Sequence, residues 1–418
     1  MSIGTAFAPE LRVRESVTGR IYQLDKEIGK GGEATIYAVK EDAGLVAKLY
    51  KPSPNDPAQS FAHRREEKVE KLRVMLANVP VDPTANLNHR SYAWPQALIT
   101  GPSDSLVLGF VMPRIGGNMK VLFDFYNPSR RRETCPLFDY RYLLRTARNI
   151  AGIMNALHSK GYVIGDVNQK NILVSDSAMV SIIDTDSFQV RDPKTSRIYP
   201  CPVDTPGFGA PERAGKSEKQ PRTTEQDLFK LGLLLFHLLM EGVHPFNCRY
   251  DGPGEPPPID QAVSSGHYPY RQGSVFKPMS TAPSFAMLDP TLQALFNRCF
   301  HEGHGNPALR PMAKEWQDAL RIASKSLIQC KVNGQHYFGS HLVTRCPWCE
   351  RVARGYRDSF PSPATTAPQK SASHNLTGSA PAFSAVTTNP NKSQTATVLK
   401  ILFGALFIIV AVCLALLR

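Results

Sequence analysis

The sequence predicts an α+β protein of two lobes, followed by a short cysteine-rich segment and one apolar C-terminal helix. Between residues 20 and 118, short apolar runs alternate with turns, a pattern typical of an antiparallel sheet. From residue 137 to 327, apolar residues instead recur at helical spacing over long stretches. A sheet-rich lobe followed by a helical lobe indicates an α+β architecture with a cleft between the two.

The composition is that of a globular protein, because 42% of the 418 residues are hydrophobic and 20% are charged. It excludes a wholly disordered chain, a collagen-like chain and a protein with many membrane spans. The net charge of +13 is concentrated beyond residue 321, which indicates a membrane surface or a nucleic acid as the partner class. The argument for nucleic-acid binding depends on charge alone, so we do not expect such binding.

The sheet-rich lobe contains a glycine-rich turn between two strand-like runs, with Gly29, Gly31 and Gly32 in the sequence GKGGEA. Glycines let backbone amides approach phosphate oxygens because no Cβ obstructs them. About one hairpin later, Lys48 ends the apolar run LVAK, where a buried ammonium needs an anion. A charged stretch over residues 61–77 predicts the single helix of this lobe.

The helical lobe carries polar residues beside short strand-like runs. Asp166 is followed five residues later by Asn171, which directly precedes the run ILV, and Asp184 ends the apolar run SIID. The sequence TPGFGAPE over 205–212 and a helical run beginning at Asp227 come next. In this order the motifs resemble the eukaryotic-type protein kinase family, in a divergent branch similar to its bacterial members.

That resemblance implies a protein-kinase-like domain over residues 20–325 that transfers the γ-phosphate of ATP to Ser/Thr hydroxyls of protein substrates. Asp166 would accept the hydroxyl proton, and Asn171 and Asp184 would bind Mg²⁺. The adenine would meet the Met112 carbonyl and the Arg114 amide. The residues implied to contact ATP are Ile28, Gly29, Lys30, Gly31, Gly32, Ala47, Lys48, Glu70, Met112, Arg114 and Leu173.

Two ion pairs are also implied by the resemblance. A carboxylate of the 61–77 helix should hold Lys48 against the α and β phosphates of ATP; we favour Glu70, and Glu66 and Glu67 stay open. In the helical lobe, Glu212 should form a buried ion pair with Arg310.

Two departures from the family pattern affect regulation and metal binding. Ile-Gly precedes Asp166 where the family has His-Arg, so no arginine there could clamp a phosphorylated activation loop. Asp184-Thr185-Asp186 replaces the family's DFG and makes Asp186 a second acidic candidate for metal. A pseudokinase scaffold and a small-molecule phosphotransferase therefore stay open as alternatives. Self-association could allow autophosphorylation at four candidate sites, Thr195, Ser196, Tyr199 and Thr205.

A second group of residues has the spacing of a metal site. Cys330 and His336 precede the Cys-x-x-Cys pair formed by Cys346 and Cys349. Thiolates and an imidazole in this spacing suit tetrahedral, structural Zn²⁺, and the segment resembles a short zinc ribbon. His341 could replace His336, and a redox-active Cys-x-x-Cys is the alternative.

The C-terminal boundaries follow from composition. Residues 328–352 would form the zinc-ribbon-like segment, and the Ser-, Thr- and Pro-rich residues 359–397 a disordered linker. Residues 399–417 are long and apolar enough to predict one transmembrane helix. Because basic residues gather before this helix, we expect a single-pass membrane protein whose kinase domain lies in the cytoplasm.

Overall fold

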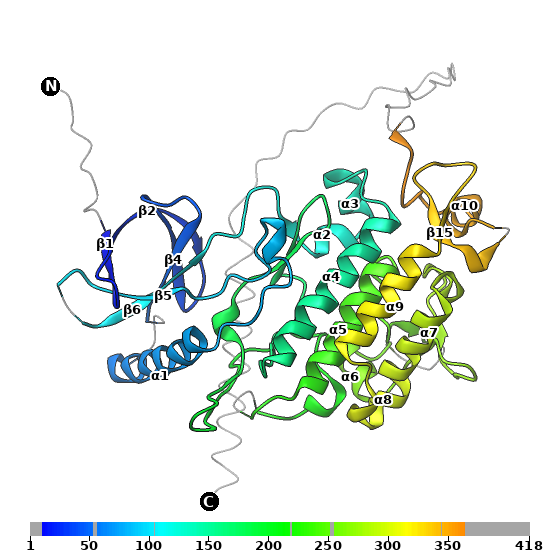
Figure 1. The fold of residues 1–418 in the computed structure, drawn as a ribbon. Coiled ribbons are helices and arrows are strands. Elements are labelled where there is room, and N and C mark those ends of the chain that lie inside the picture. Colours follow the sequence, from blue (N-terminus) through cyan, green and yellow to red (C-terminus); the bar gives the residue numbers. More distant parts are fainter. Residues whose placement is uncertain are drawn as a thin grey trace, which may run out of the picture. The chain divides into compact units, whose positions relative to one another are not determined.

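The structure is a computed structural model, and it describes residues 11–52, 57–103, 105–217, 220–250, 255–343 and 345–363 (Figure 1). All of these residues belong to one compact unit, residues 1–367. The predicted disordered linker lies almost entirely outside the described residues, and the predicted helix over 399–417 lies wholly outside them.

The first lobe is a closed antiparallel barrel, seen in blue and cyan in Figure 1. Its interior is apolar and includes Val13, Ala47, Ile99 and Val111. The strands, in their order around the barrel, are β1 (Leu11–Glu15), β2 (Ile21–Lys30), β3 (Ala34–Val39), β4 (Leu45–Tyr50), β6 (Val107–Pro113) and β5 (Ala97–Thr100). Strand β1 lies upstream of residue 20, where we expected the domain to begin, and it closes the barrel by pairing with both β2 and β5.

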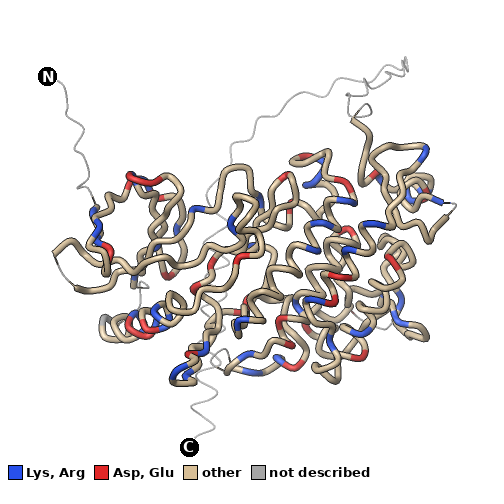
Figure 2. Tube along the Cα trace, viewed as in Figure 1, with Lys and Arg blue, Asp and Glu red and all other residues tan. Residues whose placement is uncertain are grey.

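One helix, α1 (Ala58–Ala77), accompanies the barrel, as the charged stretch over 61–77 predicts. Val69, Leu72 and Met75 bury its apolar face in the main core. Acidic and basic residues crowd the exposed faces of this helix (Figure 2). The helix therefore carries its ionisable side chains close to strand β4, where they matter for the site.

The second lobe is helical, and its longest helix, α4, packs against both α5 and α9. Helix α5 is buried on all sides because almost every residue from Gln226 to Leu239 is apolar or internally paired. The helices are α2 (Phe123–Tyr126), α3 (Pro128–Thr134), α4 (Tyr140–Ser159), α5 (Thr224–Leu239), α6 (Ile259–Ser264), α7 (Pro290–Asn297), α8 (Gly303–Gly305), α9 (Ala313–Lys325) and α10 (Pro347–Ala353), with a π-helical turn at Arg298–Glu302.

Short strands and 3₁₀ turns connect these helices and shape the loops of the site. The strands are β7 (Lys120–Val121), β8 (Ile172–Val174), β9 (Val180–Ile182), β10 (Val190–Arg191), β11 (Ile198–Tyr199), β12 (Cys248–Arg249), β13 (Lys277–Pro278), β14 (Leu327–Gln329) and β15 (Tyr337–Gly339). The 3₁₀ turns are Ala85–Leu87, Thr185–Ser187, Pro211–Arg213, Phe285–Met287, Pro307–Leu309 and Ser340–Leu342.

The two lobes share one hydrophobic core. Tyr92 forms an isolated bridge with Ile182 of β9, and the Trp94 ring meets that of Tyr162 at 4.9 Å between centroids. The Tyr162 hydroxyl donates to the carbonyl of Asn78 at the end of α1, at 2.6 Å. These contacts fix the segment after α1 against the helical lobe.

The predicted membrane location is corrected by the structure. Searching the described ranges finds no helix long and apolar enough to cross a membrane. The single-pass topology is therefore wrong on this finding, and we do not carry it further.

Candidate active site

A buried carboxylate, that of Asp227, binds the backbone of the loop that carries Asp166. Asp227, near the start of α5, accepts hydrogen bonds from the backbone N–H groups of Ile164 and Gly165 at 2.7 and 2.9 Å. Asp227 is fully buried, so these bonds also satisfy its charge inside the lobe. The run DLFKLG thus positions the loop around Asp166 as well as forming a helix.

The carboxylate of Asp166 accepts three side-chain hydrogen bonds. Its Oδ2 accepts from the side-chain amides of Asn168 at 2.9 Å and Asn171 at 3.1 Å. Its Oδ1 accepts from the Thr205 hydroxyl at 2.7 Å. The sequence predicted Asp166 and Asn171 as site residues, but it did not predict that Thr205 would contact Asp166.

Asn171 and Asp184 are brought together by the β8–β9 hairpin. The backbone N–H of Ile183 donates to the carbonyl of Asn171 at 2.9 Å, which places Asp184 next to that asparagine. Asp184 adopts a left-handed backbone with φ of 62°, and its side chain is 47% exposed. Carboxylate and carboxamide oxygens are the ligands that Mg²⁺ prefers, so this donor set fits the metal that the sequence implied.

Lys48 on β4 does not pair with a glutamate of α1. Its Nζ lies 2.6 Å from Asp184 Oδ1 and 2.6 Å from Asp186 Oδ1. Burial lowers the pKa of Lys48, but the two carboxylates outweigh it and the net shift is upward. The favoured partner, Glu70, instead binds Arg197 at 2.6 Å. Arg197 lies in the segment between Asp184 and Glu212, which we call the activation segment.

The two other candidate glutamates do not reach Lys48 either. Glu67 lies 3.6 Å from Arg197, and Glu66 is exposed. The structure therefore departs from the expected pairing because the exposed face of α1 turns toward the β10–β11 segment. The repeated aspartate in Asp184-Thr185-Asp186 was the sequence signal that could have identified the second partner of Lys48.

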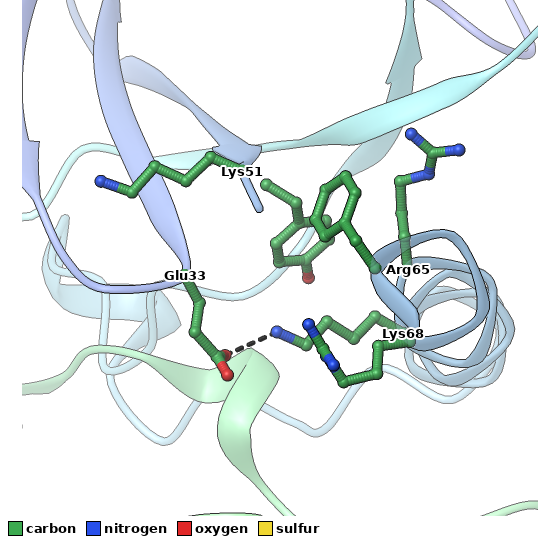
Figure 3. Close-up of a pocket in the computed structure, with 7 residues that line it drawn as sticks. Glu33, Lys51, Arg65 and Lys68 are labelled. Carbon is green, nitrogen blue, oxygen red and sulfur yellow. Dashed lines mark hydrogen bonds and ion pairs between the residues drawn. The ribbon is translucent and has the colours of Figure 1, made fainter. Parts of the chain in front are cut away.

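The glycine-rich turn lies at the tip of the β2–β3 hairpin. The N–H of Gly31 donates to the carbonyl of Ala34 at 2.9 Å, and a Cβ at Gly32 would meet nothing within 4 Å. Lys68 of α1 reaches the turn and binds Glu33 at 2.6 Å, across a pocket also lined by Lys51 and Arg65 (Figure 3). Neither Lys48 nor Asp166 lines this pocket, although it is also lined by Tyr50, whose hydroxyl donates to Asp186.

The residues implied to surround the adenine are distributed over two faces of β4 and β6. Ala47 lies inside the barrel, whereas Val46 joins the main core with Phe110 and Met112. Side chains alternate along a strand, so Val46 shares the face of Lys48 and Ala47 does not.

The other residues expected to contact ATP lie on or next to strands β2, β6 and β8. The N–H of Arg114, expected to face adenine, donates to the carbonyl of Gly44 at 2.7 Å. Leu173 on β8 is half-buried and pairs with Val121. Ile28 is 39% exposed, and Gly29 and Lys30 lie beside it on β2.

Gly165 stands where the family has an arginine before Asp166, and one basic side chain, that of Arg222, lies beside it. A Cβ at Gly165 would lie 2.7 Å from Cys201 and 3.1 Å from Arg222, so these two side chains fill that space. Arg222 and Lys230 lie 3.2 and 2.7 Å from the carboxylate of Asp204, next to Thr205. Burial raises the pKa of Asp204, but these cations outweigh it and lower it overall. The residue directly before Thr205 is therefore held in place by two basic side chains.

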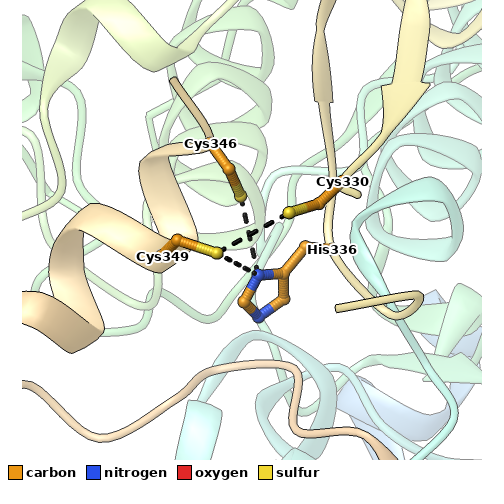
Figure 4. A group of neighbouring side chains, drawn as sticks. All are labelled: Cys330, His336, Cys346 and Cys349. Atoms are coloured by element: carbon orange, nitrogen blue, oxygen red, sulfur yellow. Dashed lines mark hydrogen bonds between the residues drawn. The ribbon is translucent and has the colours of Figure 1, made fainter. Parts of the chain in front are cut away.

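The predicted metal ligands form a compact group at the C-terminal side of the helical lobe (Figure 4). Sγ of Cys349 lies 3.6 Å from Sγ of Cys330 and 3.4 Å from Nδ1 of His336, and Sγ of Cys346 lies 3.5 Å from that nitrogen. Nε2 of His336 contacts Asp358 at 2.9 Å. His341 lies elsewhere, with its ring near the carbonyl of Ala286.

Comparisons with known proteins agree on one family. The sequence model of the protein kinase domain family matches residues 90–316 of this chain. "Protein kinase YegI" of Escherichia coli strain K12 is 34% identical over 338 residues, which cover 79% of this chain and 49% of that protein. The chain thus spans about half the length of this curated relative.

Two further proteins show weaker similarity. "Probable serine/threonine-protein kinase irlC" of Dictyostelium discoideum is 28% identical over 109 residues, covering 26% of this chain and 7% of that protein. The crystal structure of a rhoptry kinase from Toxoplasma gondii aligns with a TM-score of 0.47 and 15% identity, covering 75% of this chain and 83% of that chain.

Proposed function

This chain belongs to the protein kinase family, and we propose that it transfers the γ-phosphate of ATP to serine and threonine hydroxyls of proteins. The proposal is supported by the name of the E. coli relative and by the order of the residues around Asp166. The alignment with irlC, whose name includes serine/threonine specificity, points to the same acceptors.

In this proposal each polar residue of the site has an assigned role. Lys48 neutralises charge on the ATP phosphates, and Asp166 accepts the proton of the acceptor hydroxyl. Asp184 and the Asn171 carboxamide hold Mg²⁺, which supplies further neutralisation of the phosphate oxygens. Asn168 and Asn171 orient Asp166 by donating to its Oδ2. The glycines of the β2–β3 turn would contact phosphate through the backbone.

The observation that carries the proposal is the bond from the Thr205 hydroxyl to Asp166, at 2.7 Å. A short aliphatic hydroxyl lies at hydrogen-bonding distance from the presumed base, as a substrate hydroxyl would need to. Serine and threonine acceptors present the same group on the same short arm, whereas a tyrosine hydroxyl lies at the far end of a ring. This geometry therefore favours Ser/Thr acceptors.

The test is Mg²⁺-dependent phosphate transfer from labelled ATP by the full-length chain, to itself and to a generic protein acceptor. Asp166→Asn should lower kcat by about 100-fold or more and leave ATP binding intact. Asp25→Asn, an exposed position on β2, is the matched control and should behave as wild type. Phosphoamino-acid analysis should find phosphoserine or phosphothreonine, and phosphotyrosine alone would contradict the Ser/Thr assignment.

The same assay separates the alternatives. Saturable ATP binding without transfer, in wild type and with Mg²⁺ present, would favour a scaffold. Transfer only to added small molecules would favour a small-molecule phosphotransferase. Mapping of labelled sites also tests self-association for autophosphorylation, which predicts modification within the activation segment.

We also propose that Cys330, His336, Cys346 and Cys349 bind one structural Zn²⁺. With Zn–S of about 2.3 Å and Zn–N of about 2.0 Å, a tetrahedral site needs S···S near about 3.8 Å and S···N near about 3.5 Å. The separations of 3.6, 3.5 and 3.4 Å agree with these values. Asp358 on the far ring nitrogen orients the histidine, as outer partners do in zinc sites.

A further inference from the structure

Two lysines and one aspartate form a buried cluster at the centre of the proposed active site. Lys48 and Asp186 have side chains that are only 11% and 10% exposed, and Lys71 of α1 is buried beside them. Asp186 Oδ1 binds Lys48, and its Oδ2 accepts from the Tyr50 hydroxyl at 3.2 Å. Both oxygens of Asp186 are therefore engaged within the protein.

Helix α1 contributes positive charge to this cluster. Within the described ranges Lys71 makes no hydrogen bond or ion pair, although its ammonium interacts electrostatically with Asp186 and Lys48. Burial lowers the pKa of Lys71 to about 8 against the opposing effect of Asp186. Since α1 directs a lysine inward and its glutamates toward Arg197, the carboxylate that holds Lys48 has to come from another element.

We propose that Asp186 is the positioning residue for Lys48, and that it takes the part which the sequence resemblance gave to a glutamate of α1. This inference rests on the proposed function. Lys48 also contacts Asp184, but Asp184 is half-exposed and is the carboxylate that faces the metal. When Asp184 binds Mg²⁺, Asp186 still holds Lys48, whose three N–H groups allow a further bond to phosphate.

Two other roles fit the geometry less well. A second metal ligand should offer oxygens to the cleft, whereas both oxygens of Asp186 are hydrogen-bonded and two lysines next to it would repel a divalent cation. Pairing of Lys48 with Glu70 would need α1 to turn by about 100°. That rotation would break the bonds of Glu70 and Glu67 to Arg197 and move Lys71 out of its buried position.

The experiment is a double-mutant cycle on nucleotide affinity, measured with Mg²⁺ and a fluorescent ATP analogue bound to the full-length chain. Asp186→Asn should weaken binding by about 10-fold, but by less than about 2-fold in a Lys48→Met background, because Asp186 acts through Lys48. Asp186→Glu should keep part of the affinity that Asp186→Asn loses. The control Asp25→Asn, at an exposed position on β2, should bind the nucleotide as tightly as wild type. An equal loss in both backgrounds would overturn the inference.

Two further arms keep the result decisive. Asp186→Asn alone leaves the buried ammonium of Lys71 without its nearby carboxylate, and adding Lys71→Met removes that charge. The double variant should therefore fold and bind ATP only weakly. Wild-type affinity in the double variant would overturn the inference. A Glu70→Gln variant that loses as much affinity as Asp186→Asn would likewise overturn it.

Failure of the inference can be told apart from failure of the proposed function. Nucleotide affinity needs no acceptor, so the coupling of Asp186 to Lys48 can be seen even in a chain that transfers no phosphate. Transfer by wild type together with normal ATP affinity of Asp186→Asn would overturn the inference alone. If Asp186→Asn instead raised only the Mg²⁺ requirement, Asp186 would be a metal ligand and the inference would fall.

Discussion

The guanidinium of Arg310 and the carboxylate of Glu212 meet in two hydrogen bonds of 2.7 Å each. Arg310 also donates to the carbonyls of Gly303 and Glu225, and its side chain is fully buried. One arginine therefore joins the end of the activation segment, the start of α5 and the loop before α9. The sequence predicted this pair, and the structure contains it.

Loss of this pair should destabilise the helical lobe strongly. Glu212→Gln leaves a buried guanidinium without its counter-charge, so the free energy of unfolding should fall by about 3–5 kcal/mol. Arg310→Lys should rescue little, because an ammonium cannot form the paired bonds of the planar group. Chemical denaturation measures both. The control is Lys314→Ala, whose exposed pair with Asp318 should contribute less than about 1 kcal/mol; equal losses would contradict the assignment.

Gly165 should tolerate no side chain. It has φ of +76°, and a Cβ would lie 2.7 Å from Cys201. Gly165→Ala should therefore cost more than the about 1–2 kcal/mol of the left-handed backbone alone, and it should shift Asp166 and reduce kcat. Gly161→Ala is the matched control, since Gly161 has φ of +85° with nothing within 4 Å of its Cβ position. Equal stability and activity of the two variants would show that the space beside Gly165 is unimportant.

Two buried histidines should make the fold sensitive to mild acid. Burial lowers the pKa of His237 to about 4 and that of His244 to about 3. In the unfolded chain both take up protons near pH 6.5, so the stability is fully present above that pH and is lost as the pH falls toward the folded values.

The pH effect can be measured by denaturation between pH 7 and 5, above the range where Asp204 and Glu212 begin to titrate. His237→Gln should reduce the slope of stability against pH. His63→Gln removes an exposed histidine of α1 and should leave the slope unchanged. A slope that His237→Gln does not alter would refute this origin of the acid sensitivity.

Removal of zinc should loosen the C-terminal segment from the helical lobe. Trp348 lies between two metal ligands in sequence, is buried, and packs on Tyr140 and Phe360. We expect one zinc per chain by elemental analysis, and chelation or Cys349→Ser should lower the melting temperature and change tryptophan fluorescence. Cys248→Ser alters a half-buried cysteine outside the group and should retain the metal. A Cys346–Cys349 disulfide in zinc-free protein would favour the redox alternative.

Motif order was enough to predict the main parts of the candidate site. Asp166, Asn171 and Asp184 lie at short spacings around the β8–β9 hairpin, so local chain geometry brings them together. The four residues proposed to bind zinc similarly come from two short segments, and the Cys-x-x-Cys spacing alone brings two of them close. Such sites can be read from sequence because a few local hydrogen bonds decide where the side chains lie.

The partner of Lys48 could not be read in this way. Three glutamates of α1 lie within about one turn, and which face of the helix points inward depends on how it packs against β5 and β10. That packing buries Lys71 and leaves Glu70 with Arg197. The sequence could not show either whether Ala47 or Val46 shares the face of Lys48, because a shift of one residue along a strand moves each side chain to the opposite face of the sheet.

The sequence by itself therefore determined the two-lobed fold, and it predicted the acid and amide of the loop around Asp166 and the proposed metal-ligand set. Only the tertiary structure decided that Asp186 holds Lys48, that Thr205 meets Asp166, and that Asp204 ties the activation segment to Arg222 and Lys230. The physical reason is that these contacts join residues far apart in the chain. Their distances depend on how separate elements pack, and short-range spacing carries no information about that packing.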